Sequence, residues 1–593
     1  MSRQERLRES RRRGLIIQDL VLSLWIDMRV FDIIPSNLRA KGVGVSLTIF
    51  VRALLNFVGL AALLPVLYLI LDSEAIHSNR ALQAIYDAFG FSSGRGFVIA
   101  VAAAVVVFII AKNLINLLLY RVERDYIYTL YRHLSRTLFV GYFKQGLQFV
   151  KAENSAVLSR NVNVVCYTFV TGVLRPLATL ASEMMLLLMI FISIAIYSPV
   201  GALLALAVFI PVAWLYFALM RYRLDRYGNV ENEAQRRKYR DVTESFRGYA
   251  DIEINNAFPH RLSLFEREVD TIIKVGRKNA TISMLPQNFT ETGLAVGMAL
   301  LLSLGTILES GDMKILFGVF AVAGLRLLPS ARSIMGAWTS LRYNRYTIDI
   351  LDKARAVESN SVEAATTERL SFNDKIEVRN LSFRFENGTH DTLHNLSLAI
   401  GKGEKVGING ESGVGKTTLL NILLGLYKPT EGGIFIDGKE LSDDILRKWQ
   451  NSIGYVSQNT FLTDSTIVAN IALGVEEHEI DSKRIETVIE AASLTEFVAS
   501  LPKGVNTRIG ECGALLSGGQ RQRIGIARAL YKQADILFFD EATSSLDNAT
   551  EQSINRAIEH LTSSNKELTI VVVAHRESSL DYCDRIITLE KTK

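Results

Sequence analysis

Six long apolar segments constrain the fold of this 593-residue chain more than any other feature of its sequence. A helix needs about 20 mostly apolar residues to cross the hydrocarbon core of a bilayer. The six segments that meet this requirement are 45–71, 97–119, 171–197, 200–219, 289–308 and 315–336. Apolar residues make up 49% of the chain, and its mean hydropathy is positive, at +0.20, which favours membrane spans. The sequence therefore predicts an all-α membrane domain with six spans.

Basic residues predict the orientation of these spans. Arg and Lys are concentrated in the N-terminal arm and in the long segments 120–170 and 220–288, and they are scarce in 72–96. The positive-inside rule then places the basic segments, both termini and everything after the sixth span in the cytosol, with the protein in the cytoplasmic (inner) membrane. Segment 15–34, with Trp25 and Phe31, is interpreted as an amphipathic helix on the inner membrane surface. An ordinary solvated helix is the alternative.

Charge and cysteine content exclude some other classes. The net charge of +5 gives no indication of a nucleic-acid partner. The three cysteines, Cys166, Cys512 and Cys583, are odd in number and lack metal-ligand spacing. We therefore expect neither a disulfide framework nor a cysteine metal site.

The two long polar segments contain few Gly or Pro residues, so the spans are expected to continue as helices into the cytosol. The predicted turning points are 149–156 and 236–246. The membrane domain is assigned to 1–350. A linker rich in Ala, Glu, Ser and Thr follows at 351–373.

From residue 374 to 593 the pattern changes to apolar β-type runs that alternate with helical stretches, which predicts an α/β domain. The phosphate-binding pattern G-x-x-x-x-G-K-[ST] follows the predicted strand 405–409 and precedes a helix. Backbone N–H groups of this loop and the helix N-terminus can bind phosphate, Lys416 can reach the β- and γ-phosphates, and the Thr417 hydroxyl can bind Mg²⁺. The residues of the predicted loop are Gly410, Glu411, Ser412, Gly413, Val414, Gly415, Lys416, Thr417 and Thr418.

A second predicted strand, 536–540, ends in two carboxylates, Asp540 and Glu541. Asp540 is suited to hold Mg²⁺ and Glu541 to activate the attacking water as a general base. Together these residues predict an ATP-hydrolysing domain that uses ATP and Mg²⁺.

Leu516-Ser517-Gly518-Gly519-Gln520 lies shortly before the 536–540 strand. Here the chain resembles the ATP-binding-cassette (ABC) family, whose signature sequence is LSGGQ. The resemblance extends over the whole chain, because six spans followed by a C-terminal cassette are typical of type I ABC exporters. It implies a membrane all-α domain followed by an α/β P-loop nucleotide-binding domain.

The resemblance also implies roles for single residues. Phe385 corresponds to the aromatic residue that stacks on adenine, and Gln458 to the glutamine that senses Mg²⁺. Asp547, in Ser545-Leu-Asp547, corresponds to the loop at the dimer interface, and His575 to the histidine that contacts the γ-phosphate. The segment 507–513 resembles an exporter-specific loop.

One ATPase domain per chain implies a homodimer, since in this family each ATP lies between the phosphate loop of one subunit and the signature of the other. Neither the water-activating Glu541 nor His575 is replaced. Both sites of such a dimer are therefore expected to hydrolyse ATP, and ATP binding would switch a central cavity from inward-facing to outward-facing.

The cargo is predicted from charges inside the spans, which are costly to insert. Five basic residues fall in the cytosolic half of the spans, and they suit an anionic head group such as a diphosphate. These residues are Arg52, Lys112, Arg175, Arg326 and Arg332. The alternative is that they extend to the membrane surface or pair with Glu183 and Glu291.

Between the first two spans, Leu82, Ile85, Tyr86 and Phe89 fall on one helical face, which predicts an amphipathic helix on the outer membrane surface. This helix, and Arg326-Leu-Leu-Pro329-Ser in the sixth span, resemble bacterial lipid-linked-oligosaccharide flippases of the PglK type. The favoured cargo is therefore a polyprenyl-diphosphate-linked oligosaccharide. Lipid A, a drug or a peptide is the alternative cargo, and an ATP-gated channel or regulator is the alternative class.

Overall fold

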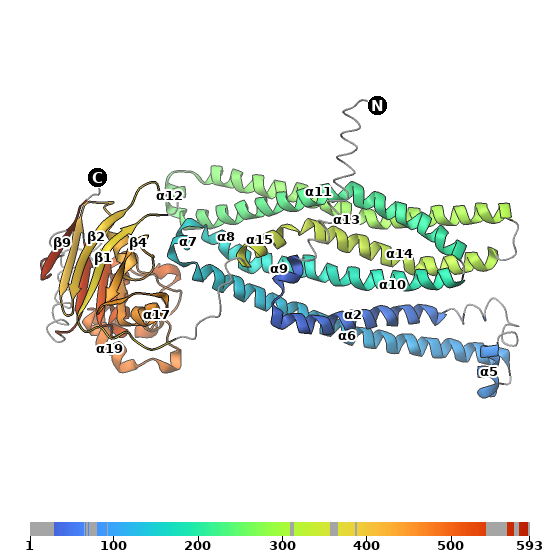
Figure 1. Cartoon of the computed structure of the whole chain (residues 1–593), viewed down its shortest axis with the longest axis horizontal. Coiled ribbons are helices and arrows are strands. Elements are labelled where there is room, and N and C mark those ends of the chain that lie inside the picture. Colours follow the sequence, from blue (N-terminus) through green and yellow to red (C-terminus); the bar gives the residue numbers. More distant parts are fainter. Residues whose placement is uncertain are drawn as a thin grey trace, which may run out of the picture. The chain divides into compact units, whose positions relative to one another are not determined.

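The structure is a computed structural model that describes residues 29–63, 66, 69, 80–91, 93–197, 199–308, 313–355, 366–385, 388–540, 566–574 and 580–590. Residue contacts divide the chain into two compact units. One unit comprises 1–145 and 149–360, and the other comprises 146–148 and 361–593. Long helices form the first unit, whereas the second contains two sheets with flanking helices (Figure 1).

The long helices of the N-terminal unit pack in pairs, α2 on α6, α10 on α14 and α11 on α13 (Figure 1). Two short π-helical segments, Asn161–Val165 and Val170–Leu174, join α8, α9 and α10 into one helical run. The helices up to the linker are α2 (Ser36–Ala61), α5 (Arg80–Ala88), α6 (Gly94–Lys144), α7 (Gly146–Ala152), α8 (Ser155–Arg160), α9 (Cys166–Phe169), α10 (Arg175–Tyr197), α11 (Pro199–Arg247), α12 (Tyr249–Ile254), α13 (Phe258–Leu308), α14 (Met313–Tyr343) and α15 (Tyr346–Arg355).

Within the described residues, three helical stretches are long and apolar enough to cross a membrane: Ser36–Ala61, Gly94–Lys144 and Ser155–Ile196. The other three predicted spans lie in α11, α13 and α14. Helix α6 has 51 residues. At 1.5 Å per residue it is roughly 75 Å long, more than twice the ~30 Å hydrocarbon core. Helix α6 is therefore longer than a bilayer crossing requires, which is compatible with the expected extension.

The first predicted turn is confirmed, because α7 ends at Ala152 and the side chain of Asn154 caps α8 by accepting a hydrogen bond from the backbone N–H of Ala156. The prediction for the second turn is wrong. Residues 236–246 lie inside α11, which continues to Arg247, and the chain reverses through Gly248, α12 and residues 255–257. The segment 231–247 contains no Gly or Pro to end the helix, and Gly248 is the first residue that does.

Most of the predicted N-terminal amphipathic helix, including Trp25, lies outside the described residues. Phe31, within it, is exposed. At the other end of the unit, residues 351–355 of the predicted linker continue helix α15.

The C-terminal unit contains an antiparallel four-stranded sheet in the order β2-β1-β4-β5 and a parallel five-stranded sheet in the order β6-β7-β8-β3-β9. The strands are β1 (Lys375–Phe383), β2 (Leu393–Gly401), β3 (Lys405–Gly410), β4 (Glu431–Ile436), β5 (Lys439–Glu440), β6 (Ile453–Val456), β7 (Ile536–Asp540), β8 (Thr569–Val573) and β9 (Arg585–Leu589). The α-helices are α16 (Lys416–Leu423), α17 (Asp443–Ser452), α18 (Ile467–Ile471), α19 (Ser482–Ala491), α20 (Thr495–Ala499) and α21 (Gly518–Tyr531).

Every residue of β7 and β8 is buried, as expected for central parallel strands covered on both faces. Because β3, β7 and β8 run parallel, their carboxyl ends meet at one edge of the sheet. That edge carries both the phosphate loop, which follows β3, and Asp540, the last residue of β7. Ligands of open α/β sheets bind at this edge.

Helix α11 lies in direct backbone contact with the end of α14 at Gly228. A Cβ atom added to Gly228 would lie 1.9 Å from the carbonyl oxygen of Tyr343. Close by, Asp225 Oδ2 contacts Arg342 Nη1 at 3.3 Å and Arg345 Nη1 at 3.6 Å. This backbone contact admits no side chain at position 228.

We therefore predict that Gly228→Ala destabilises the protein by at least about 1–3 kcal/mol, the usual cost of overpacking. Gly276→Ala is the matched control, because a Cβ at this helical glycine of α13 meets no atom within 4 Å. The control is expected to leave stability unchanged or to raise it slightly, since Ala favours helix more than Gly. Thermal unfolding of the purified variants measures both effects, and equal melting temperatures would contradict the prediction.

Candidate functional site

The phosphate loop connects β3 to α16 through glycines in conformations that other residues adopt only with strain. Gly410 has φ +151° and Gly415 has φ +107°. A Cβ at Gly410 would lie 2.6 Å from the carbonyl oxygen of Leu589, and one at Gly415 would lie 2.8 Å from Leu393 Cδ2. Both positions thus require glycine for backbone angle and for space.

Lys416 begins α16 and folds back over this loop. Its side chain is 5% exposed, and its Nζ donates hydrogen bonds to the carbonyl oxygens of Gly410 (2.6 Å) and Glu411 (3.0 Å). The ammonium group is therefore held at the centre of the loop, beside the N–H groups of the first turn of α16, which have no i−4 carbonyl partner within the helix. This combination of a cation and a helix N-terminus is suited to bind phosphate.

The other loop residues divide between the surface and the core. Glu411, Ser412, Gly413 and Thr417 are exposed, whereas Val414 and Thr418 are buried. The Thr417 hydroxyl is thus accessible to a ligand of the loop, and Thr418 packs inside the domain.

Asp540 ends β7 and is almost completely buried. The Tyr455 hydroxyl, on the neighbouring strand β6, donates to Asp540 Oδ2 at 3.5 Å. Burial raises the pKa of Tyr455, and the charge of Asp540 raises it further, so the hydroxyl stays protonated as a donor. Gln458, two residues after β6, is exposed. The hydroxyl of Thr417, the carboxylate of Asp540 and the amide oxygen of Gln458 are each of the oxygen type that Mg²⁺ prefers.

The signature begins a second helix whose N-terminus is accessible. Ser517 is exposed and caps α21: its Oγ accepts from the Gln520 backbone N–H at 3.2 Å, and Gln520 Oε1 accepts from the Ser517 backbone N–H at 2.8 Å. This reciprocal capping box fixes Ser517, whose hydroxyl proton remains able to point toward an anion. Gly518 and Gly519 follow as the first two residues of the helix.

Phe385 follows β1 and is 37% exposed, so part of its ring can receive a ligand. Four further predicted residues, Glu541, Ser545, Asp547 and His575, lie outside the described residues. The Tyr455 contact and the capping role of Gln520 were not predicted. Ser-x-x-Gln before a helix was a readable signal for the capping box, whereas the Tyr455 contact joins strands far apart in sequence.

The basic residues of the helical unit differ in their surroundings. Arg52 Nη1 donates to Glu123 Oε2 at 2.6 Å, and Glu123 is 3% exposed. Arg332 and Glu291 form an exposed pair with a 3.7 Å separation. Arg175 is exposed, and its Nη2 donates to the Tyr120 hydroxyl at 3.1 Å.

Lys112 packs against the position of Gly59, and it has polar contacts of its own. The side chain of Arg326 lies outside the description. Arg175 and Arg332 therefore remain the most accessible of the described members of this set.

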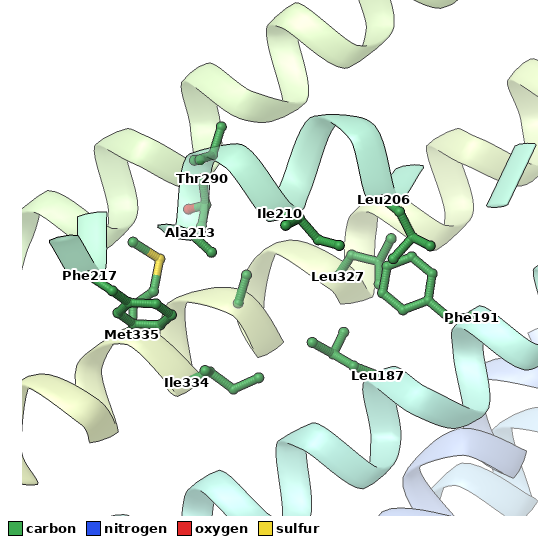
Figure 2. A pocket seen from close by; sticks show the side chains of 12 residues that line it. Leu187, Phe191, Leu206, Ile210, Ala213, Phe217, Thr290, Leu327, Ile334 and Met335 are labelled. Carbon is green, nitrogen blue, oxygen red and sulfur yellow. The ribbon is translucent and has the colours of Figure 1, made fainter. Parts of the chain in front are cut away.

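Two cavities lie among the helices of this unit. One, of about 170 Å³, lies between α10, α11, α13 and α14 and is lined almost entirely by apolar side chains such as Leu187, Phe191 and Met335 (Figure 2). The second, of about 690 Å³, is bounded by α2, α6, α10 and α14 and combines apolar walls with Arg39, Arg342 and Arg345. Of these two cavities, the second is the one lined by cations, which an anionic amphiphile would require, and Glu123 lines it as well.

Comparison with known proteins agrees with this geometry. Residues 393–544 match the family model described as "ABC transporter". The chain is 32% identical over 390 residues to an ATP-dependent lipid A-core flippase of Cupriavidus pinatubonensis, an alignment covering 65% of each protein. It is 44% identical over 216 residues to the flippase of the same name from Ralstonia nicotianae, covering 36% of each. The chain thus spans about 65% of the length of the Cupriavidus relative it matches.

Among solved structures, a bacterial Atm1-family ABC exporter with ATP bound matches with a TM-score of 0.73. The match covers 94% of both chains at 22% identity. The predicted fold class is confirmed: the chain has the ABC exporter fold, a helical membrane domain followed by an α/β nucleotide-binding domain. The C-terminal ABC-type ATPase domain is confirmed as well.

We predict that Lys416→Ala lowers the rate of ATP hydrolysis by at least about 100-fold, the usual effect of removing a charge-stabilising donor from a transition state. Lys428→Ala is the control, because Lys428 is 77% exposed and pairs only with the equally exposed Asp443 in the described structure. Phosphate release from purified protein measures both. A substantial rate in Lys416→Ala would remove this lysine from the site.

Proposed function

We propose that the protein is one half of a homodimeric, ATP-driven transporter of the cytoplasmic membrane that moves a lipid-anchored anionic substrate from the inner to the outer leaflet. The observation that carries the proposal is the presence, in one chain, of helices long enough to span a membrane and an ATPase domain with both a phosphate loop and a signature helix. In this arrangement the cytosol contains both termini and the ATPase domain.

The homodimer follows from the two helix N-termini of the ATPase domain. Each chain has one phosphate loop before α16 and one signature before α21. If the Ser517 hydroxyl of one subunit and Lys416 of the other bind the same γ-phosphate, two identical chains form two equivalent sites. Both ends then bring positive dipoles and donors to one anion.

In the proposed reaction, Lys416 and the loop N–H groups hold the phosphates, and Phe385 stacks on the base. Thr417, Asp540 and Gln458 would hold Mg²⁺, which would neutralise charge that develops on the phosphates. Glu541 accepts a proton from the attacking water, and His575 contacts the γ-phosphate. Tyr455, by donating to Asp540, keeps this carboxylate oriented.

Transmission to the membrane would use the cytosolic helix turns. The turn between α11 and α13 carries strongly exposed apolar side chains, among them Phe246, Tyr249 and Ile254. Exposed apolar side chains of this size are costly to leave in water, so we propose that they contact another protein surface. We therefore propose this turn, and the turn between α7 and α8, as the elements that respond to ATP binding.

The cargo we favour is a lipid A-type glycolipid. Its acyl chains would lie along the apolar walls of the 690 Å³ cavity, whose lining also includes the cations Arg39, Arg342 and Arg345. Its phosphates would also meet Arg175 and Arg332, which are exposed and do not line that cavity. The names of the relatives, lipid A-core flippases, support this choice.

A polyprenyl-diphosphate-linked oligosaccharide is the second candidate. Helix α5 (Arg80–Ala88) is present at the position predicted for the outer-surface helix, and Phe89 beside it is 76% exposed. No comparison favours this cargo over lipid A.

Transfer of labelled lipids in proteoliposomes tests the proposal. ATP should drive transfer of a fluorescent lipid A analogue, and Glu541→Gln should abolish it while ATP still binds. Faster transfer of a polyprenyl-diphosphate oligosaccharide than of lipid A would reverse the order of the two candidates. An active ATPase that moves neither lipid would refute lipid transport.

We further predict that Arg175→Gln lowers lipid transfer about tenfold, equivalent to one charge-assisted hydrogen bond of about 1.4 kcal/mol. Basal ATP hydrolysis without lipid should change little, because Arg175 lies in the helical unit. Arg136→Gln, an exposed arginine on the extension of α6, is the control and should alter neither quantity. Parallel loss of transfer and basal hydrolysis would indicate a structural role for Arg175 instead.

A further inference from the structure

We infer that Tyr427 and Phe383 are positioning residues that fix the ring of Phe385 for stacking on a nucleotide base. The inference rests on the proposed nucleotide site, in which Phe385 receives the base. The three rings differ in accessibility: Phe385 is 37% exposed, whereas Phe383 is 2% and Tyr427 is 6% exposed. The accessible ring of Phe385 thus packs against two buried rings.

The ring geometry defines the orientation of Phe385. Phe383 and Tyr427 lie parallel, with centroids 5.3 Å apart and an interplanar angle of 6°. Phe385 stands perpendicular to both, at 5.0 Å and 86° from Phe383 and at 5.8 Å and 84° from Tyr427. Edge-to-face contacts of this kind are favourable beyond the area they bury. Two of them hold one ring, and rotation of Phe385 would break both.

The supporting rings are themselves fixed by the backbone. Phe383 ends β1, and its carbonyl accepts a hydrogen bond from the Thr392 N–H at 2.8 Å. Tyr427 follows α16, and its N–H donates to the Asn421 carbonyl at 3.2 Å. Because α16 begins with Lys416, Tyr427 links the placement of the base-stacking ring to that of the phosphate-binding helix.

This arrangement predicts an effect on nucleotide affinity and not on the chemical step. A Phe385 ring already held in one orientation loses little conformational freedom when a base stacks on it. Without the Tyr427 ring, Phe385 would sample several rotamers, and binding would have to select one. The reacting γ-phosphate is at the other end of the nucleotide, so the turnover rate should not depend on this support.

The test compares the full-length protein with Phe385→Leu, Tyr427→Leu and the double variant, by KM and kcat for ATP hydrolysis. Tyr427→Leu is expected to raise KM about three- to tenfold, with kcat unchanged to within about twofold, as loss of one aromatic contact would. In the Phe385→Leu background the same change should have little further effect, because the ring it positions is gone. Tyr427→Phe keeps the ring and should restore the wild-type KM.

Other outcomes would overturn the inference. Equal effects of Tyr427→Leu in both backgrounds, or a lower kcat with unchanged KM, would show that Tyr427 does not act through Phe385. If the Tyr427→Leu variant does not fold, as judged by thermal unfolding, Phe383→Leu is tested in its place. It must then raise KM in the wild-type background and have little further effect in the Phe385→Leu background. A wild-type KM in Phe385→Leu would instead refute the base-stacking role of Phe385 and with it this part of the proposed nucleotide site. That result differs from a failure of Tyr427 to position the ring, which would leave the KM of Phe385→Leu raised.

Discussion

Backbone hydrogen bonding in an apolar medium is the constraint on which the rest of the N-terminal unit depends. No water is present in a hydrocarbon core to satisfy N–H and C=O groups, so a crossing segment must pair them within the protein, as a helix does. Helices α6, α11 and α13 obey this requirement and continue far beyond the length that a bilayer needs. Their polar extensions are rich in charged residues, which are few in the spans, and this contrast of composition within one helix allows the unit to be predicted from sequence.

The C-terminal unit is under a different constraint, because it must bind a polyanion with few charged side chains. The donors that we propose are largely backbone N–H groups at the starts of α16 and α21, supplemented by Lys416 and the Ser517 hydroxyl. Backbone donors are fixed by the fold, so they need little reorganisation when phosphate binds. The glycines at 410 and 415 are required because any larger residue would displace the loop that presents these donors.

Features set by local sequence could be predicted, and features set by pairing of distant residues could not. The phosphate loop, the signature, the strand before Asp540 and the turn between α7 and α8 depend on neighbours within a few residues. The second turn was placed too early, because helix-favouring residues continue to Arg247 and only Gly248 marks the end. The Arg52–Glu123 pair and the contact of Phe385 with Tyr427 join residues far apart in sequence, so only the tertiary structure could reveal them.

The length of α6 has a mechanical consequence. A helix without a proline-induced kink behaves as a stiff rod, and α6 contains no proline across its 51 residues. For a rod of roughly 75 Å, a tilt of only about 5° about one end displaces the other end by roughly 6–7 Å. Small changes in tilt near the Lys144 end of α6 are therefore amplified into movements as large as a helix turn at the Gly94 end, without any change in the internal structure of the helix.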